Sequence, residues 1–150
     1  MATFTKINDF LEGAFEAEHN LAADTIQLAL SNTAPASEVP DPTASGNGIL
    51  ANVTEIAYTN YTDDMAVDRV LEGVTSNEAA GTYTFDANDV VITASGGALA
   101  TFRYIYVFNQ TSATPADQLI GVWDHGSAIS LASGESATIA WNAGGIFTNV

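Results

Sequence analysis

The sequence predicts a mainly β protein: an antiparallel β-sandwich of the jelly-roll or immunoglobulin-like type, with one N-terminal α-helix. Three observations support this prediction. Apolar residues follow helical spacing near the N-terminus, and from Asp24 onward they alternate with polar residues as in half-buried strands. Turn-forming pairs such as Ser133-Gly134 and Gly144-Gly145 separate the apolar stretches. Many short strands at such intervals are typical of a sandwich or barrel.

Length and composition indicate one folded domain over residues 1–150. A chain of 150 residues buries roughly 68–70% of its unfolded surface, which is enough for one core. Hydrophobic residues make up 47% of the chain and charged residues 14%, a composition typical of folded proteins. There is no cysteine, so disulfides and thiolate metal sites are excluded.

The helix is expected over about residues 5–20, with a single apolar face. The residues of that face recur at the spacing i, i+3, i+4, i+7, i+8, and they are Ile7, Phe10, Leu11, Ala14 and Phe15. Thr5 is the expected N-cap, and Asp9 and Glu12 suit the positive end of the helix dipole. His19 lies near the expected C-terminus, where a partial positive charge is favoured.

Strands are expected through most of the remaining chain. Their ranges are 24–31, 53–58, 69–75, 82–86, 90–95, 98–109, 118–124, 127–132, 136–142 and 146–150. The strand over 98–109 is the most informative. Phe102, Tyr104, Tyr106 and Phe108 form one of its faces, and Ile105 and Val107 contribute to the other. Because both faces are apolar, this strand is expected to be central.

Residues 33–48 interrupt the strands without any periodicity. They include three prolines and two glycines, and the segment is long for a connection, since most connections have about 4–6 residues. Two interpretations are open: a mobile loop, or an extended arm that lies on a neighbouring subunit. We expect the arm, ordered only in an assembly.

The charge balance restricts the possible partners. Eighteen acidic residues stand against Lys6, Arg69 and Arg103, a net charge of -15. Such a charge repels nucleic-acid phosphates and anionic lipid headgroups, so neither is an expected partner. Asp9, Glu12 and other acidic residues near the N-terminus are unlike a signal peptide, and synthesis in a host cytoplasm is expected.

Catalytic patterns are lacking in the sequence. His19 and His125 are the only imidazoles, and no nucleophile-elbow or phosphate-binding glycine motif occurs. Two acidic sets could be considered for Ca²⁺, and they are Asp63, Asp64 and Asp68, and Asp86, Asn88 and Asp89. Neither set matches the EF-hand spacing. We therefore assign no catalytic, cofactor-binding or metal-binding residue and expect no enzyme activity.

Several stretches carry a family resemblance when they are taken together and in order. They are Phe4–Phe10, Ile26–Pro35, Leu50–Tyr58, Val91–Ala98, Phe102–Tyr104, Pro115–Gly121, Asp124–Gly126 and Leu131–Ser136. In these stretches the chain resembles small structural virion proteins of tailed bacteriophages. The resemblance covers nearly the whole chain and implies a virion location, many copies and no catalysis. It carries over no functional residues.

The subclass that suits the resemblance best is a capsid decoration, or cement, protein. It would stabilise the head shell from the outer capsid surface, with the major capsid protein and further copies of itself as partners. A homo-oligomer, specifically a trimer, is expected because closed symmetry matches the local threefold axes of a capsid. The alternatives are a tail component, either tube or tail tip, and a receptor- or carbohydrate-binding module. A sugar would stack on Trp123 or Trp141, although Trp141 alternates with apolar residues and is expected in the core.

Overall fold

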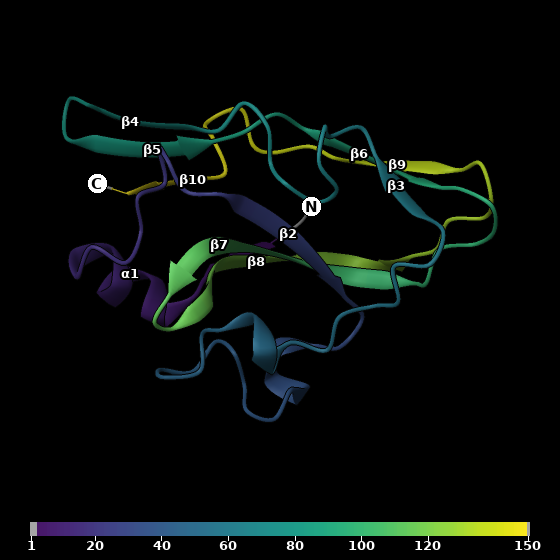
Figure 1. Cartoon of the computed structure of the whole chain (residues 1–150), viewed down its shortest axis with the longest axis horizontal. Coiled ribbons are helices and arrows are strands. Elements are labelled where there is room, and N and C mark those ends of the chain that lie inside the picture. Colours follow the sequence, from purple (N-terminus) through teal and green to yellow (C-terminus); the bar gives the residue numbers. More distant parts are fainter. Residues whose placement is uncertain (1–2, 150) are drawn as a thin grey trace.

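The computed structural model describes residues 3–149, and Figure 1 shows strands stacked in layers. The central layer is a four-stranded antiparallel sheet in the order β1-β8-β7-β2. Its strands are β1 (Thr3–Lys6), β8 (Ala116–Ile129), β7 (Phe102–Ala113) and β2 (Ile26–Ser31). Alternating apolar residues in these segments give each strand a face to bury, which drives the stacking of the layers.

A second layer covers one face of this sheet and consists of two three-stranded antiparallel sheets (Figure 1). One contains β10 (Phe147–Asn149), β5 (Thr82–Asp86) and β4 (Thr75–Ala79). The other contains β3 (Tyr61–Asp63), β6 (Val90–Ala94) and β9 (Ser136–Ile139). The structure thus confirms a mainly β fold with a sandwich-like arrangement and one short α-helix near the N-terminus, although the second layer is divided into two sheets.

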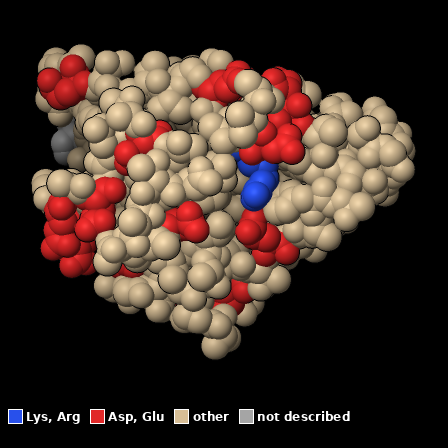
Figure 2. Space-filling model, viewed as in Figure 1, with Lys and Arg blue, Asp and Glu red and all other residues tan. Residues whose placement is uncertain are grey.

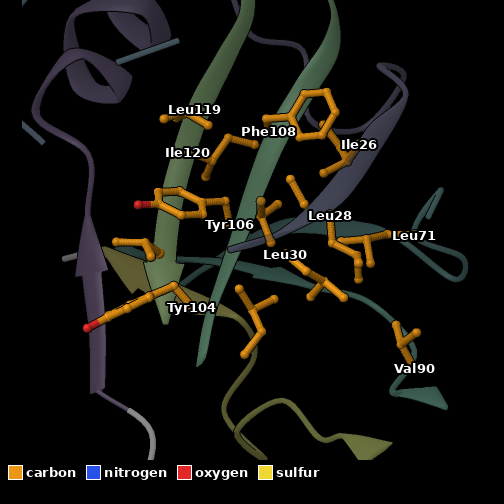
Figure 3. Close-up of a cluster of buried hydrophobic side chains, with 14 of the residues drawn as sticks. Ile26, Leu28, Leu30, Leu71, Val90, Tyr104, Tyr106, Phe108, Leu119 and Ile120 are labelled. Carbon is orange, nitrogen blue, oxygen red and sulfur yellow. The ribbon is translucent and has the colours of Figure 1, made fainter. Parts of the chain in front are cut away.

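The core occupies both faces of the central sheet. Leu28 and Leu30 share one face with Val107 and Ile105, whereas the buried Tyr104 and Tyr106 lie on the opposite face. Figure 3 shows side chains of β2, β7 and β8 gathered with Leu71 and Val90. Every residue of β7 from Tyr104 to Asn109 is buried, because β7 lies between β8 and β2 and both of its faces are covered. The expected central strand is therefore confirmed. It extends four residues beyond the predicted end at Asn109, into a hairpin with β8.

The N-terminal helix is shorter than predicted. Helix α1 spans Asn8–Phe15, and the residues before it form β1, paired with β8. Thr5 therefore lies in a strand and does not cap the helix; the N-cap position is Ile7, which makes no side-chain capping bond. Its backbone N–H instead donates to the carbonyl of Ile120 at 3.2 Å. Pairing with the free edge of β8 thus outweighs a weak helical propensity at this point.

The single apolar face predicted for the helix is only partly correct. Ile7 and Phe10 are buried against the core, as expected. Leu11 is 37% exposed and Phe15 is 88% exposed. The buried residues of α1 are Asp9, Phe10 and Gly13, so the side of the helix that carries Leu11 and Phe15 is turned away from the core.

Residues 33–48 fold beneath the central sheet, on the face away from the second layer (Figure 1). They include the 3₁₀ turn η1 (Pro35–Ser37), and η2 (Leu50–Asn52) follows. Two buried carboxylates hold the region. Asp9 accepts hydrogen bonds from the N–H groups of Gly46 and Gly48, and Glu38 accepts two from Thr54, one from its N–H and one from its hydroxyl. The expected extended arm is therefore corrected, because the segment packs against its own domain.

Two predicted strands are also corrected. Residues 53–58 and 69–75 are mostly loops that each form one bridge to β2, at Glu55 and Val70. They shield the outer edge of β2, which removes the need for a further strand. The strands predicted at 118–124 and 127–132 belong largely to one strand, β8, which continues through Gly126 in a left-handed conformation with φ +89°.

Candidate functional site

The acidic sets considered for Ca²⁺ serve as anchors for turns. The Asp63 carboxylate accepts hydrogen bonds from the N–H groups of Met65 and Arg69, at 3.1 and 2.8 Å. The Asp89 carboxylate accepts one from the N–H of Trp141 at 2.9 Å. Within residues 3–149, no group of three or more His, Cys, Asp or Glu side chains is arranged to hold a metal ion.

Members of the two acidic sets do approach each other. Asp64, Glu72 and Asp89 line a small polar hollow of about 60 Å³. Each of these carboxylates already accepts a backbone hydrogen bond: Asp64 from Val91 at 2.8 Å and Glu72 from Ala66 at 2.7 Å. The hollow thus joins two turns, and we assign no ligand to it.

The two histidines lie apart and in different environments. His125 is exposed on β8, and its Nδ1 lies 3.0 Å from the carbonyl oxygen of Ser127. His19 lies beyond the end of α1, where its Nδ1 is 3.0 Å from the side-chain amide of Asn109. That amide also donates to Asp24 at 2.6 Å, which ties the segment after α1 to β7.

The charge expected on His19 is corrected by this environment. Burial lowers the pKa of His19 below its ordinary value of 6.5, although the nearby Asp24 acts in the opposite direction. The amide nitrogen of Asn109 can only donate a hydrogen bond, so Nδ1 of the neutral His19 ring accepts it. Burial and the contact with the Asn109 amide thus favour the neutral form of His19, which ties the segment after α1 to the sheet.

Three aromatic rings form a row along one edge of the sandwich. The ring centroids of Phe4 and Trp123 are 4.6 Å apart, and those of Trp123 and Trp141 are 5.1 Å apart. The Trp141 indole N–H donates to the carbonyl oxygen of Asn88 at 2.9 Å, which fixes its orientation. Both tryptophans are half-buried, so the full burial expected for Trp141 is not observed.

Two hollows flank this aromatic row. One, of about 380 Å³, lies between β8 and β9 and includes Ile105, Ile129 and the exposed His125. The other, of about 500 Å³, lies against residues 140–148 and includes Asn142. An apolar hollow with a few polar groups at its rim is the usual form of a small-molecule site.

A third hollow, of about 400 Å³, lies between α1 and the second layer. Phe10, Tyr83 and Phe147 form its aromatic floor, and Leu11 and Phe15 stand at its rim. The floor is firmly packed, because the rings of Phe10 and Phe147 meet edge to face with centroids 5.3 Å apart. We call this region the α1 hollow.

No match to the chain is found among protein-family models, curated proteins or solved structures. Among the described residues, no helix is long and apolar enough to cross a membrane.

The sequence indicates Trp123 and Trp141 as possible sugar-stacking residues, but it does not predict the α1 hollow or the exposed Val39. The α1 hollow joins residues from positions 6–21, 76–83 and 147–149, which only the folded chain brings together. The sequence contains one relevant signal, because Phe15 is a large apolar residue at the end of the predicted apolar helix face. Val39 is a similar case, because it stands between the buried Glu38 and the exposed Pro40 and is itself 97% exposed.

Proposed function

We propose that the chain is a non-enzymatic structural protein of a tailed-phage virion that stabilises the head shell from its outer surface. The observation that carries this proposal is the anchored loop around Val39. Glu38 is 8% exposed and accepts hydrogen bonds from both the N–H and the hydroxyl of Thr54, each at 2.8 Å. The next side chain, Val39, projects into solvent. A loop held in this way loses little conformational entropy when a partner covers it.

Charge supports the same role. A protein on the outside of a capsid need not touch DNA, so a net charge of -15 carries no penalty there. The resemblance to small virion proteins supplies the partners that we propose, the major capsid protein and further copies of this chain in a trimer. Charges more than about 8 Å apart are largely screened at physiological salt, so apolar contacts decide whether copies associate.

Imaging of virions with and without this protein tests the proposal. The expected result is density on the outer shell that is lost without the protein and restored by its addition. Shells that rebind wild type but not the Val39→Asp variant would identify the loop as the contact. Density confined to the tail would overturn the decoration role and favour the tail tube or tip.

The aromatic row favours a second candidate, a carbohydrate-binding module. Trp123 and Trp141 present half-buried rings beside two hollows, and sugars stack on such faces. Titration with neutral oligosaccharides, followed by tryptophan fluorescence, tests this role. Binding that Trp123→Ala removes would support it, and unchanged fluorescence across a varied set of sugars would oppose it.

A further inference from the structure

The α1 hollow has an apolar rim that no other part of the described chain covers. Leu11 and Phe15 are four residues apart on one helix, so their side chains are neighbours on its surface. Phe15 is the second most exposed of the large apolar side chains, after Val39. Unlike Val39, it stands at the rim of a concave surface with an aromatic floor. A partner side chain inserted there would contact both the floor and the rim.

The surroundings of the α1 hollow are strongly acidic. Glu12 and Glu16 are exposed on and just after the same helix, and Glu78 is exposed at the end of β4. Figure 2 shows carboxylates gathered over α1 and at the tip of the β4–β5 hairpin, in the positions where Figure 1 places these elements. Lys6 is the cationic residue among those lining the hollow. The field at its entrance is therefore negative.

This field restricts the occupant. Phosphates and anionic lipid headgroups are repelled by it. A second copy of this chain would bring a net charge of -15 toward the same acidic rim. It also has few cations to offer: Arg69 is ion-paired with Glu55 at 3.0 Å, and Arg103 with Asp124 at 2.7 Å. Charge complementarity instead favours a segment that carries Lys or Arg beside apolar residues.

We propose that the α1 hollow is a docking site for a basic amphipathic segment of a partner protein. Apolar side chains of that segment lie against Phe15 and the aromatic floor, and its cations face Glu12 and Glu16. This surface is distinct from the Val39 loop, and the proposal does not depend on a virion role. Because apolar burial provides affinity and the acidic rim provides attraction, binding must depend on both Phe15 and ionic strength.

The test uses the full chain and two synthetic peptides with leucines at helical spacing, one with lysines and one with glutamates between them. Calorimetric titration is expected to show that the leucine–lysine peptide binds and that added salt weakens the binding. Burial of one Phe side chain corresponds to roughly a tenfold to hundredfold change in affinity, so the Phe15→Ser variant should lose about that factor. Because the Phe15 side chain is exposed, the Phe15→Ser variant should fold normally, and its circular dichroism spectrum should match that of the wild-type protein.

A matched control separates docking from simple attraction between opposite charges. Val67 is 61% exposed and lies between the acidic residues Asp64 and Asp68, so the Val67→Ser variant removes an apolar side chain from a different acidic surface. The proposal requires unchanged affinity in this variant. Equal binding of the peptide to wild type and to both variants would overturn it.

Two further results would also overturn the proposal. The first is equal binding of the leucine–glutamate peptide, which would exclude charge complementarity. The second is self-association of the free protein that Phe15→Ser abolishes in sedimentation, because the occupant would then be a second copy.

Discussion

Removing the hydroxyl of Tyr106 is expected to stabilise the protein. Tyr106 is 0% exposed, and within residues 3–149 its hydroxyl has no hydrogen-bond partner. Burial raises the pKa of this phenol, and the nearby carboxylates of Glu38 and Asp41 raise it further. Burying a hydroxyl without a partner costs about 1–3 kcal/mol in proteins. The Tyr106→Phe variant removes this cost and leaves the ring in place, so a gain of about 1 kcal/mol is expected.

The same substitution at Tyr58 provides the matched control. Its hydroxyl donates to the Glu55 carboxylate at 2.6 Å and accepts from the N–H of Leu30 at 2.9 Å. The Tyr58→Phe variant loses a bond to a charged group and leaves a strand N–H unpaired, which costs about 1.5–3 kcal/mol. Removal of the hydroxyl should therefore raise the free energy of unfolding at Tyr106 and lower it at Tyr58.

Urea unfolding of the two variants and wild type measures both effects. Thermal unfolding provides a second measurement, because a change of 1 kcal/mol in stability corresponds to a shift of about 2–4 °C in the melting temperature of a chain of this size. The slope of the free energy against urea concentration should stay constant, because neither change alters the surface exposed on unfolding. A Tyr106→Phe variant destabilised as much as Tyr58→Phe would refute the reasoning, since its hydroxyl would then be satisfied in solution.

Three further outcomes are expected. The Asp9→Ala variant removes the acceptor of two loop N–H groups and should lower the free energy of unfolding by about 2–3 kcal/mol, with faster amide exchange at residues 46–48. The lowered pKa of His19 means that the unfolded chain takes up a proton more readily, so stability should fall as the pH drops below 6.5. This loss of stability should be absent from the His19→Gln variant and present in the His125→Gln variant when the denaturant midpoints of each are compared between pH 7 and pH 5. A Cβ added at the buried Gly121 would overlap the Phe4 ring, so Gly121→Ala should cost about 1–3 kcal/mol in the same unfolding assay.

Local patterns were sufficient to predict the strands that bury a face. The alternation in 24–31 and the two apolar faces of 98–109 correspond to β2 and β7, because side-chain periodicity reports directly on burial. The strand β1 could not be predicted in the same way. Its partner in β8 lies more than 110 residues away, and only that pairing outweighs helix formation at Thr5.

The candidate sites required information that no local pattern contains. A helical wheel identifies the apolar residues of α1 but does not show how the helix lies on the sheet, so the exposure of Phe15 could not be predicted. The anchoring of residues 33–48 depends on the carboxylates of Asp9 and Glu38, whose donors are mostly backbone N–H groups. Every residue except proline has a backbone N–H, so the sequence does not show which of them bind these carboxylates. The length and proline content of residues 33–48 therefore predict an arm, although the segment packs on its own domain.

The distribution of charge suggests how two kinds of association could coexist on this molecule. Fifteen of the 18 acidic residues precede Val90, and after it only Asp117, Asp124 and Glu135 follow. Figure 2 shows carboxylates over α1, at the tip of the β4–β5 hairpin and across the middle of this face, whereas the end toward which β9 extends shows little charge. Under the homo-oligomer proposal, copies of the chain are expected to approach each other through this weakly charged end, where few carboxylates are brought together.

Ionic strength should therefore separate the two modes. Contact between copies through apolar, weakly charged surfaces should persist or strengthen as salt rises, because residual repulsion is screened. Docking of a basic segment at the α1 hollow should weaken over the same range, because its attraction is screened. Sedimentation and peptide titration of the same sample across a salt series would show opposite trends. Parallel trends would mean that one surface serves both associations, and the assignment of a basic partner to α1 would then fail.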